Sequence, residues 1–209
     1  EGLKKNPSYR AEIKIERLDL SDLNLIKDLK VRGMMTSKNV RIAGGPGTKP
    51  PKISGDLQLR EGAIESPYGT FDRMNADLIL SSEKEISVRG EAFARVVRVG
   101  KYIPEKPVEA RVSGSIRGPM GQFSVTSFLS ISPLEIKLDG GEPLRVESGL
   151  VTIEGTMEGD TFSGRNALEM NGLKFAGRFL PWVKSSSGIA YQKNEVDLRN
   201  LAIETEDTK

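Results

Sequence analysis

The chain has 209 residues, of which 37% are hydrophobic, 6% aromatic and 29% charged, and its 31 basic and 29 acidic residues leave a net charge of +2. This near-balance gives no electrostatic reason to expect nucleic acid or an anionic surface as a partner. The chain contains neither cysteine nor histidine, which excludes disulfides, thiolate metal sites and every catalytic triad built on imidazole. An enzyme would have to work with carboxylates, lysine, tyrosine or a bound cofactor, and no motif for such chemistry is found, so we expect no cofactor, no metal and no enzymatic activity.

The N-terminal quarter predicts two strands with a short helix between them. Residues 11–20 alternate apolar and polar side chains, which is typical of a strand with one wet face. Ser21 follows as a candidate helix cap, and the spacing of the next leucines and isoleucine predicts a short helix near residues 22–29. Residues 31–42 return to the strand pattern, and the glycines and prolines of residues 43–51 predict a loop.

From Ile53 onward, the alternation predicts a long antiparallel meander. The expected strand segments are 57–64, 74–88, 108–118, 123–138, 144–153, 168–175 and 196–203. Asn171–Gly172 is the best short hairpin signal, whereas Phe179–Gly188 breaks the alternation, so we expect an irregular break over 179–188. Leu57–Ile64 and Leu144–Val151 share a pattern with glycine at the same place, which predicts a tight turn or a bulge in each.

Apolar side chains recur at every second position along these segments, so one face of the predicted sheet is apolar. One interpretation is an ordinary core, closed by a second sheet or covered by the short helix. The other is a groove that stays partly open and accepts an apolar ligand, since large exposed apolar surfaces usually mark binding sites. The candidate groove residues are Leu57, Leu59, Leu78, Leu80, Ile86, Val88, Val108, Val112, Ile116, Phe123, Val125, Leu134, Ile136 and Leu138.

Three stretches favour the second interpretation. Residues 18–33 combine a helical pattern with a strand that ends in glycine. Residues 50–64 follow the order proline, Ile-x-Gly-x-Leu-x-Leu, glycine and a β-branched residue, and residues 75–80 and 85–90 form a strand pair after it. This order of signals resembles the AsmA-like and TamB-like proteins of Gram-negative bacteria. The similarity is best over residues 18–140 and fades after residue 155.

The resemblance implies a mostly β fold, in which a long antiparallel meander curves into a half-open, taco-like groove, with one short helix at 22–29. It implies a non-enzymatic, periplasmic envelope protein that carries phospholipid along the groove between the inner and outer membranes and contributes to outer-membrane homeostasis. The family has no catalytic residues to transfer. Its N-terminal membrane anchor is not in this sequence, so we expect residues 1–209 to be a single elongated domain from a longer protein. About a dozen strands span only roughly 50 to 60 Å, so we expect one segment of a longer groove.

The expected partners are a phospholipid or another acyl-chain ligand, neighbouring groove segments and an outer-membrane protein. The alternative hypothesis is a closed β-sandwich that serves as a structural scaffold and binds a protein partner along its edge strands. An enzyme is the most remote hypothesis, because the aromatic content is low for a β-sandwich that stacks sugars. An open trough lined by aliphatic side chains would favour lipid binding, and a closed interior would favour the scaffold.

Overall fold

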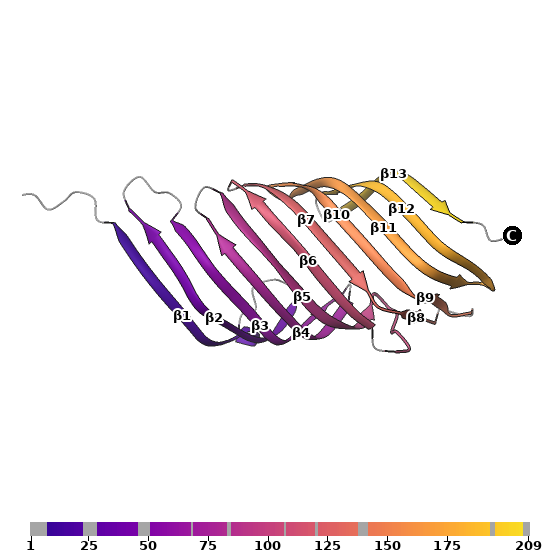
Figure 1. Ribbon diagram of the computed structural model, residues 1–209, viewed down its shortest axis with the longest axis horizontal. Coiled ribbons are helices and arrows are strands. Elements are labelled where there is room, and N and C mark those ends of the chain that lie inside the picture. The colour runs from indigo at the N-terminus through magenta and orange to yellow at the C-terminus, as the bar shows by residue number, and fades with distance from the viewer. Residues whose placement is uncertain are drawn as a thin grey trace, which may run out of the picture.

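The computed structural model describes residues 8–22, 29–45, 51–67, 69–82, 85–106, 108–119, 121–137, 142–192 and 195–206. Their strands form a single antiparallel sheet in the order β1-β2-β3-β4-β5-β6-β7-β10-β11-β12-β13, while β8 pairs with β9 and β9 with β11. Figure 1 shows the strands side by side from one end of the sheet to the other. The elements are β1 (Tyr9–Asp19), the 3-10 turn η1 (Leu20–Asp22), β2 (Lys30–Gly44), β3 (Lys52–Ser66), β4 (Gly69–Ser81), β5 (Ile86–Val99), β6 (Val108–Gly118), β7 (Gln122–Ile131), β8 (Leu134–Ile136), β9 (Leu144–Val146), β10 (Ser148–Glu158), β11 (Thr161–Phe175), β12 (Arg178–Gln192) and β13 (Glu195–Thr205).

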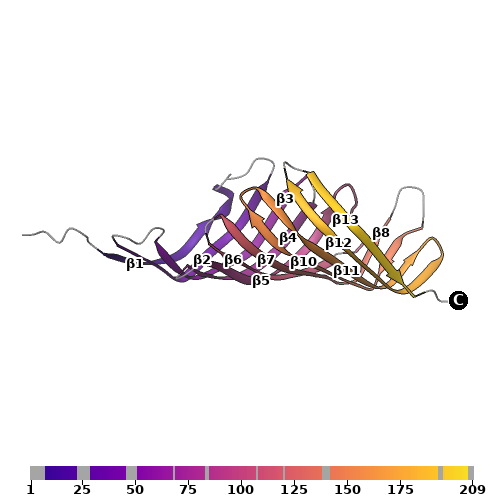
Figure 2. The ribbon, with the colours of Figure 1, turned by 90° about the horizontal axis from the view of Figure 1, so that it is seen from above.

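Irregular residues bend the strands at neighbouring positions. The pairing of β2 with β3 shifts register at Gly33, which lies opposite Glu61 and Gly62. The pairing of β3 with β4 shifts register on either side of Gly62, and on β4 the irregular residues include Arg73. Glu61 and Arg73 have φ of 53° and 50°, the left-handed values expected at bulges, which bend a strand and increase its twist. Figure 2 shows the result from above, a curved sheet that is not closed into a barrel. The predicted fold class, a curved open meander, is confirmed.

The hairpin between β11 and β12 turns at Ala176 and Gly177, whose φ values of 50° and 72° fit the two-residue turns that match strand twist. The predicted hairpin at Asn171–Gly172 is therefore wrong, because both residues lie inside β11. Gly172 has φ of 60°, and Glu147, between β9 and β10, donates its backbone N–H to the carbonyl of Asn171 at 3.0 Å. Gly172 therefore bends β11 opposite Glu147, where β9 ends and β10 begins, and the chain continues in the same direction.

Three further expectations meet the structure with different outcomes. The predicted break at 179–188 is wrong, because these residues lie within β12. Pro181 fits there because the last β13 pair is Val183 with Thr205, so β12 is an edge strand at the proline. Of the predicted helix at 22–29, Asp22 ends η1, Leu29 lies in no helix, and residues 23–28 lie outside the described residues. The predicted loop at 43–51 begins after Gly44, which ends β2, and residues 46–50 also lie outside the described residues.

The register gives the sheet two chemically different faces. We call the apolar face the side that carries Val88, Ile116 and Val125, which are paired across β5, β6 and β7. We call the polar face the opposite side, which carries Arg89 and Arg117 on two of the same strands. The small core lies on the apolar face: it comprises Val96, Val108 and Ala110, with Phe71, Leu129, Ile131 and Leu134 packed against them.

We expect Gly114→Ala to lower the free energy of unfolding by about 2 kcal/mol, as overpacking of a tight site does. A Cβ atom at Gly114 would lie 2.4 Å from the backbone oxygen of Thr126, which cannot move without disturbing the β6–β7 pairing. Gly149→Ala is the matched control, since a Cβ at Gly149 has no neighbour closer than 3.9 Å and should stabilise the strand by about 0.5 kcal/mol. Urea denaturation of both variants measures the difference, and equal stabilities would contradict the crowding.

Candidate functional site

The candidate groove residues share the apolar face wherever the structure describes them. Leu57 on β3 is paired directly with Leu78 on β4. A second row of direct pairs runs from Leu80 on β4 through Val88 on β5 and Ile116 on β6 to Val125 on β7. The remaining candidates follow by alternation along the same strands or by contact with the core: Leu59 on β3, Ile86 on β5, Val108 and Val112 on β6, Phe123 on β7, and Leu134 and Ile136 on β8. Leu138 lies outside the described residues.

The apolar face also extends further than the candidates. Val151 and Ile153 on β10 pair with the candidate side of β7, and the row continues through β11 and β12 to β13. The residues that extend it are Val151, Ile153, Leu168, Met170, Val183, Ile189, Leu198 and Ile203. Their signal is the same alternation, so sequence reasoning could have included them.

Part of this face is open to solvent. On β6, Val108 is 1% exposed, whereas Val112 and Ile116, further along the strand, are each 40% exposed. All described strands belong to one sheet, so no separate second sheet covers these side chains. The closed-sandwich hypothesis is therefore wrong for the described strands. A side chain as buried as Val108 in a single layer indicates that the sheet curves toward its apolar face at the core.

A recess of about 370 Å³ lies on the apolar face near the start of β3 and β5. Its apolar walls come from Ile53, Leu80, Ile86 and Val88, and Pro51 closes one side. Three of these residues, Leu80, Ile86 and Val88, are predicted groove residues. Since three neighbouring strands supply the walls, an aliphatic segment lying across the strands would contact all of them.

The polar face is crossed by ion pairs between neighbouring strands. Asp72 on β4 is paired directly with Arg95 on β5, whose Nε donates to Asp72 Oδ1 at 2.6 Å while the second guanidinium nitrogen donates to Oδ2. These hydrogen bonds hold the pKa of Asp72 below its ordinary value and raise the pKa of Arg95. Other cross-strand pairs are Arg41–Glu12 at 3.1 Å, Arg60–Asp77 at 2.7 Å, Arg145–Glu135 at 2.7 Å, Lys184–Glu169 at 3.2 Å, and Glu65 with Arg32 at 3.7 Å and Lys30 at 4.0 Å.

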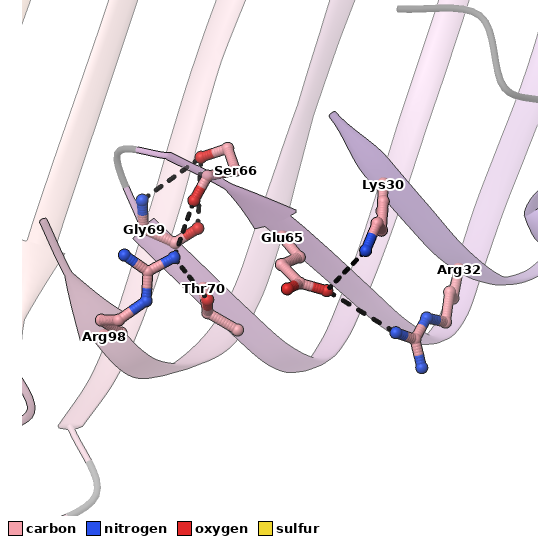
Figure 3. Close-up of polar contacts among 7 residues, drawn as sticks. All are labelled: Lys30, Arg32, Glu65, Ser66, Gly69, Thr70 and Arg98. Carbon is pink, nitrogen blue, oxygen red and sulfur yellow. Dashed lines mark hydrogen bonds and ion pairs between the residues drawn. The ribbon is translucent and has the colours of Figure 1, made fainter. Parts of the chain in front are cut away.

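Polar contacts also fix the turn between β3 and β4, as Figure 3 shows. The Ser66 hydroxyl donates to the Gly69 carbonyl at 3.1 Å and accepts from the Gly69 N–H at 3.2 Å. Arg98 on β5 donates to the Ser66 carbonyl at 2.8 Å and to the Thr70 hydroxyl at 3.3 Å. Residues of β3, β4 and β5 thus meet in one hydrogen-bonded cluster at this turn.

We expect Asp72→Asn to lower the free energy of unfolding by about 1 kcal/mol at pH 7, since the pair is bidentate and only partly exposed. Because the folded pKa of Asp72 is depressed, this stability is present above the unfolded pKa of about 3.9 and is lost as the pH falls through the folded value. Urea denaturation at pH 7 and near pH 2 measures it. Asp77→Asn, at a more exposed pair, is the control, and a difference that persists at pH 2 would contradict the assignment.

Neither a metal centre nor a membrane-spanning helix is visible in the described part of the chain. Its Asp and Glu side chains form no group of three or more that could hold a metal ion. No helix among the described residues is long and apolar enough to cross a membrane. Comparison of the chain with protein-family models, with curated proteins and with solved structures finds no match.

Proposed function

We propose that the apolar face binds the acyl chains of lipids. The observation that carries this proposal is an apolar surface that continues across β3 to β13 and stays open, with Val112 and Ile116 each 40% exposed. Covering such a surface with an acyl chain is favourable by about 0.8 kcal/mol per buried methylene before the cost of ordering the chain. A lipid tail is thus a ligand that this face can hold without any catalytic group.

In this proposal the tail lies across the strands, and the polar head stays in water at the rim. The lining of β3 to β7 is mostly Leu, Ile and Val with glycine and alanine between them, and β7 adds Phe123 and Ser127, so most neighbouring positions differ little in energy for a methylene chain. A tail is therefore free to slide from strand to strand. The polar face carries the cross-strand ion pairs together with exposed Ile79, Phe93 and Phe128, so the continuous aliphatic row lies on the apolar face alone.

The proposed context is the periplasm, with a parent protein anchored in the inner membrane and phospholipid carried toward the outer membrane. It is supported by the resemblance of residues 18–140 to AsmA-like and TamB-like proteins. The eleven-strand path of the sheet has ten spacings, or about 48 Å, which is short for a bridge between membranes. Neighbouring groove segments or an outer-membrane protein would therefore complete the path.

Native mass spectrometry of the purified chain, after expression in a bacterial periplasm and with lipid extraction, tests the proposal. Co-purified phospholipid or fatty acid at a defined stoichiometry is the expected result. A clean apo mass that does not change on adding phospholipid or a fluorescent fatty acid would overturn it. In that case the open edges, β1 and β13, would be the surfaces to test for a protein partner.

A further inference from the structure

One polar pair lies inside the apolar face. Asn166 on β11 pairs directly with Ser187 on β12, and Asn166 also faces Ile153 on β10. The next residues on the same side are Leu168 along β11 and Ile189 along β12, both apolar. Ser187 is only 6% exposed, and its hydroxyl donates to Asn166 Oδ1 at 2.9 Å. The pair is thus a polar spot on the apolar face with Ile153, Leu168 and Ile189 beside it, while Gly164 and Ser185 are its other same-face neighbours along the two strands.

Asn166 keeps unused hydrogen-bonding capacity at this spot. Its amide nitrogen carries two donor hydrogens, and within the described residues Nδ2 donates no hydrogen bond, since Asn166 takes part there only as the acceptor for Ser187. Ser187 orients the side chain, because binding Oδ1 fixes the amide plane and with it the direction of Nδ2. A donor without a partner on an apolar surface is costly once water is displaced from it, so a ligand covering this face gains by offering an oxygen there.

The pair also ends a row of residues that crosses the apolar face at one level. Gly90, Gly114, Ser127, Ile153 and Asn166 are paired in turn across β5, β6, β7, β10 and β11. Four strand spacings separate the first from the last, or about 19 Å. Beyond Gly90 the row continues to Leu78 on β4 and Leu57 on β3, so an extended chain lying along it can place its polar end at Asn166.

We propose that Asn166, held by Ser187, binds the oxygen at the polar end of an acyl ligand whose tail lies along this row. The inference rests on the proposed function, because it assigns the position at which the bound lipid stops sliding. The recognised chemistry is a carbonyl or carboxylate oxygen accepting hydrogen bonds from Nδ2. Free fatty acids and glycerolipid esters both supply it.

The test compares the affinities of three probes, hexadecane, palmitic acid and dipalmitoyl phosphatidylglycerol, by displacement of an apolar fluorophore from the full chain. Asn166→Leu removes both donors at nearly constant volume. Asn171→Leu is the matched control, because Asn171 lies on the same strand but pairs with Trp182 and Ser148 on the polar side. Circular dichroism confirms that both variants are folded.

We expect Asn166→Leu to weaken binding of the oxygen-bearing probes three- to tenfold, the range of one hydrogen bond, and to leave hexadecane unchanged or tighter. Loss for palmitic acid alone identifies the carboxylate as the source, and loss for phosphatidylglycerol identifies the ester. Equal effects on all three probes, or an equal effect of Asn171→Leu, would overturn the inference while leaving the proposed function intact. If wild type binds none of the probes, the proposed function itself fails and the inference falls with it.

Discussion

Replacing Val112 with aspartate should weaken lipid binding roughly 30-fold or more while the sheet stays folded. Val112 is 40% exposed in a central strand, so the free protein keeps the new carboxylate in water. A tail that covers this position must strip water from the charge, and a desolvation cost of about 2 kcal/mol accounts for the loss. Titration of a fluorescent fatty acid measures the affinity, and native mass spectrometry measures the lipid that co-purifies.

The matched control is Ser113→Asp, which adds the same charge to the next residue of β6 on the polar face. We expect this variant to bind lipid as the wild type does. Ile116→Asp repeats the test on the apolar face, since Ile116 is as exposed as Val112. If the Val112 and Ile116 variants fold and bind as tightly as the Ser113 variant, acyl chains do not lie on this face.

The second large effect concerns the fold itself: Val108→Asp should lower the free energy of unfolding by about 3 kcal/mol or more. Val108 is the most buried large side chain among the described residues and the centre of the small core. A carboxylate there loses its water without gaining a partner, one of the few mechanisms that produce so large a change. Thermal and urea denaturation followed by circular dichroism measure the loss.

The comparison variant is Val99→Asp, at the exposed end of β5, where we expect a change within about 0.5 kcal/mol. A similar small effect at Val108 would mean that the core does not hold the bend of the sheet. Because the two substitutions are chemically identical, any difference between them comes from the environment of the side chain.

Alternation of apolar and polar residues predicted most of the strands and the shared face of the groove candidates, but it placed a break where β12 runs and joined β4 and β5 into one segment, 74–88. It could not distinguish a turn from a bulge, because both require a residue with unusual backbone angles. Glu61–Gly62 became a bulge and Gly172 a bend inside β11. Whether such a residue reverses the chain depends on the partner strand, as with Glu147 opposite Gly172, and that partner is distant in sequence.

The differences in burial along the apolar face could not be predicted from the sequence either. Val108 and Val112 carry the same side chain on the same strand and face, yet one is almost completely buried and the other is open. The difference comes from the core cluster at Val108, where side chains from β4, β5, β7 and β8 pack together, a set of neighbours distant in sequence. Ile136 shows the practical consequence: it is buried, so a charge there would test folding rather than lipid binding.

Along the sheet, the strands contact mainly their immediate neighbours. The stability of the sheet therefore depends on a linear series of strand-to-strand contacts. Its cohesion is approximated by a sum of strand terms and nearest-neighbour couplings, as in repeat proteins. Such a chain opens from its ends, β1 and β13, each of which has a single neighbour in the sheet, and β13 is exposed along its whole length. Strands in the middle are held from both sides and open last. A ligand lying across several strands would contact strands that do not touch each other. It would therefore link their unfolding, so that strands which otherwise open separately from the ends would unfold together.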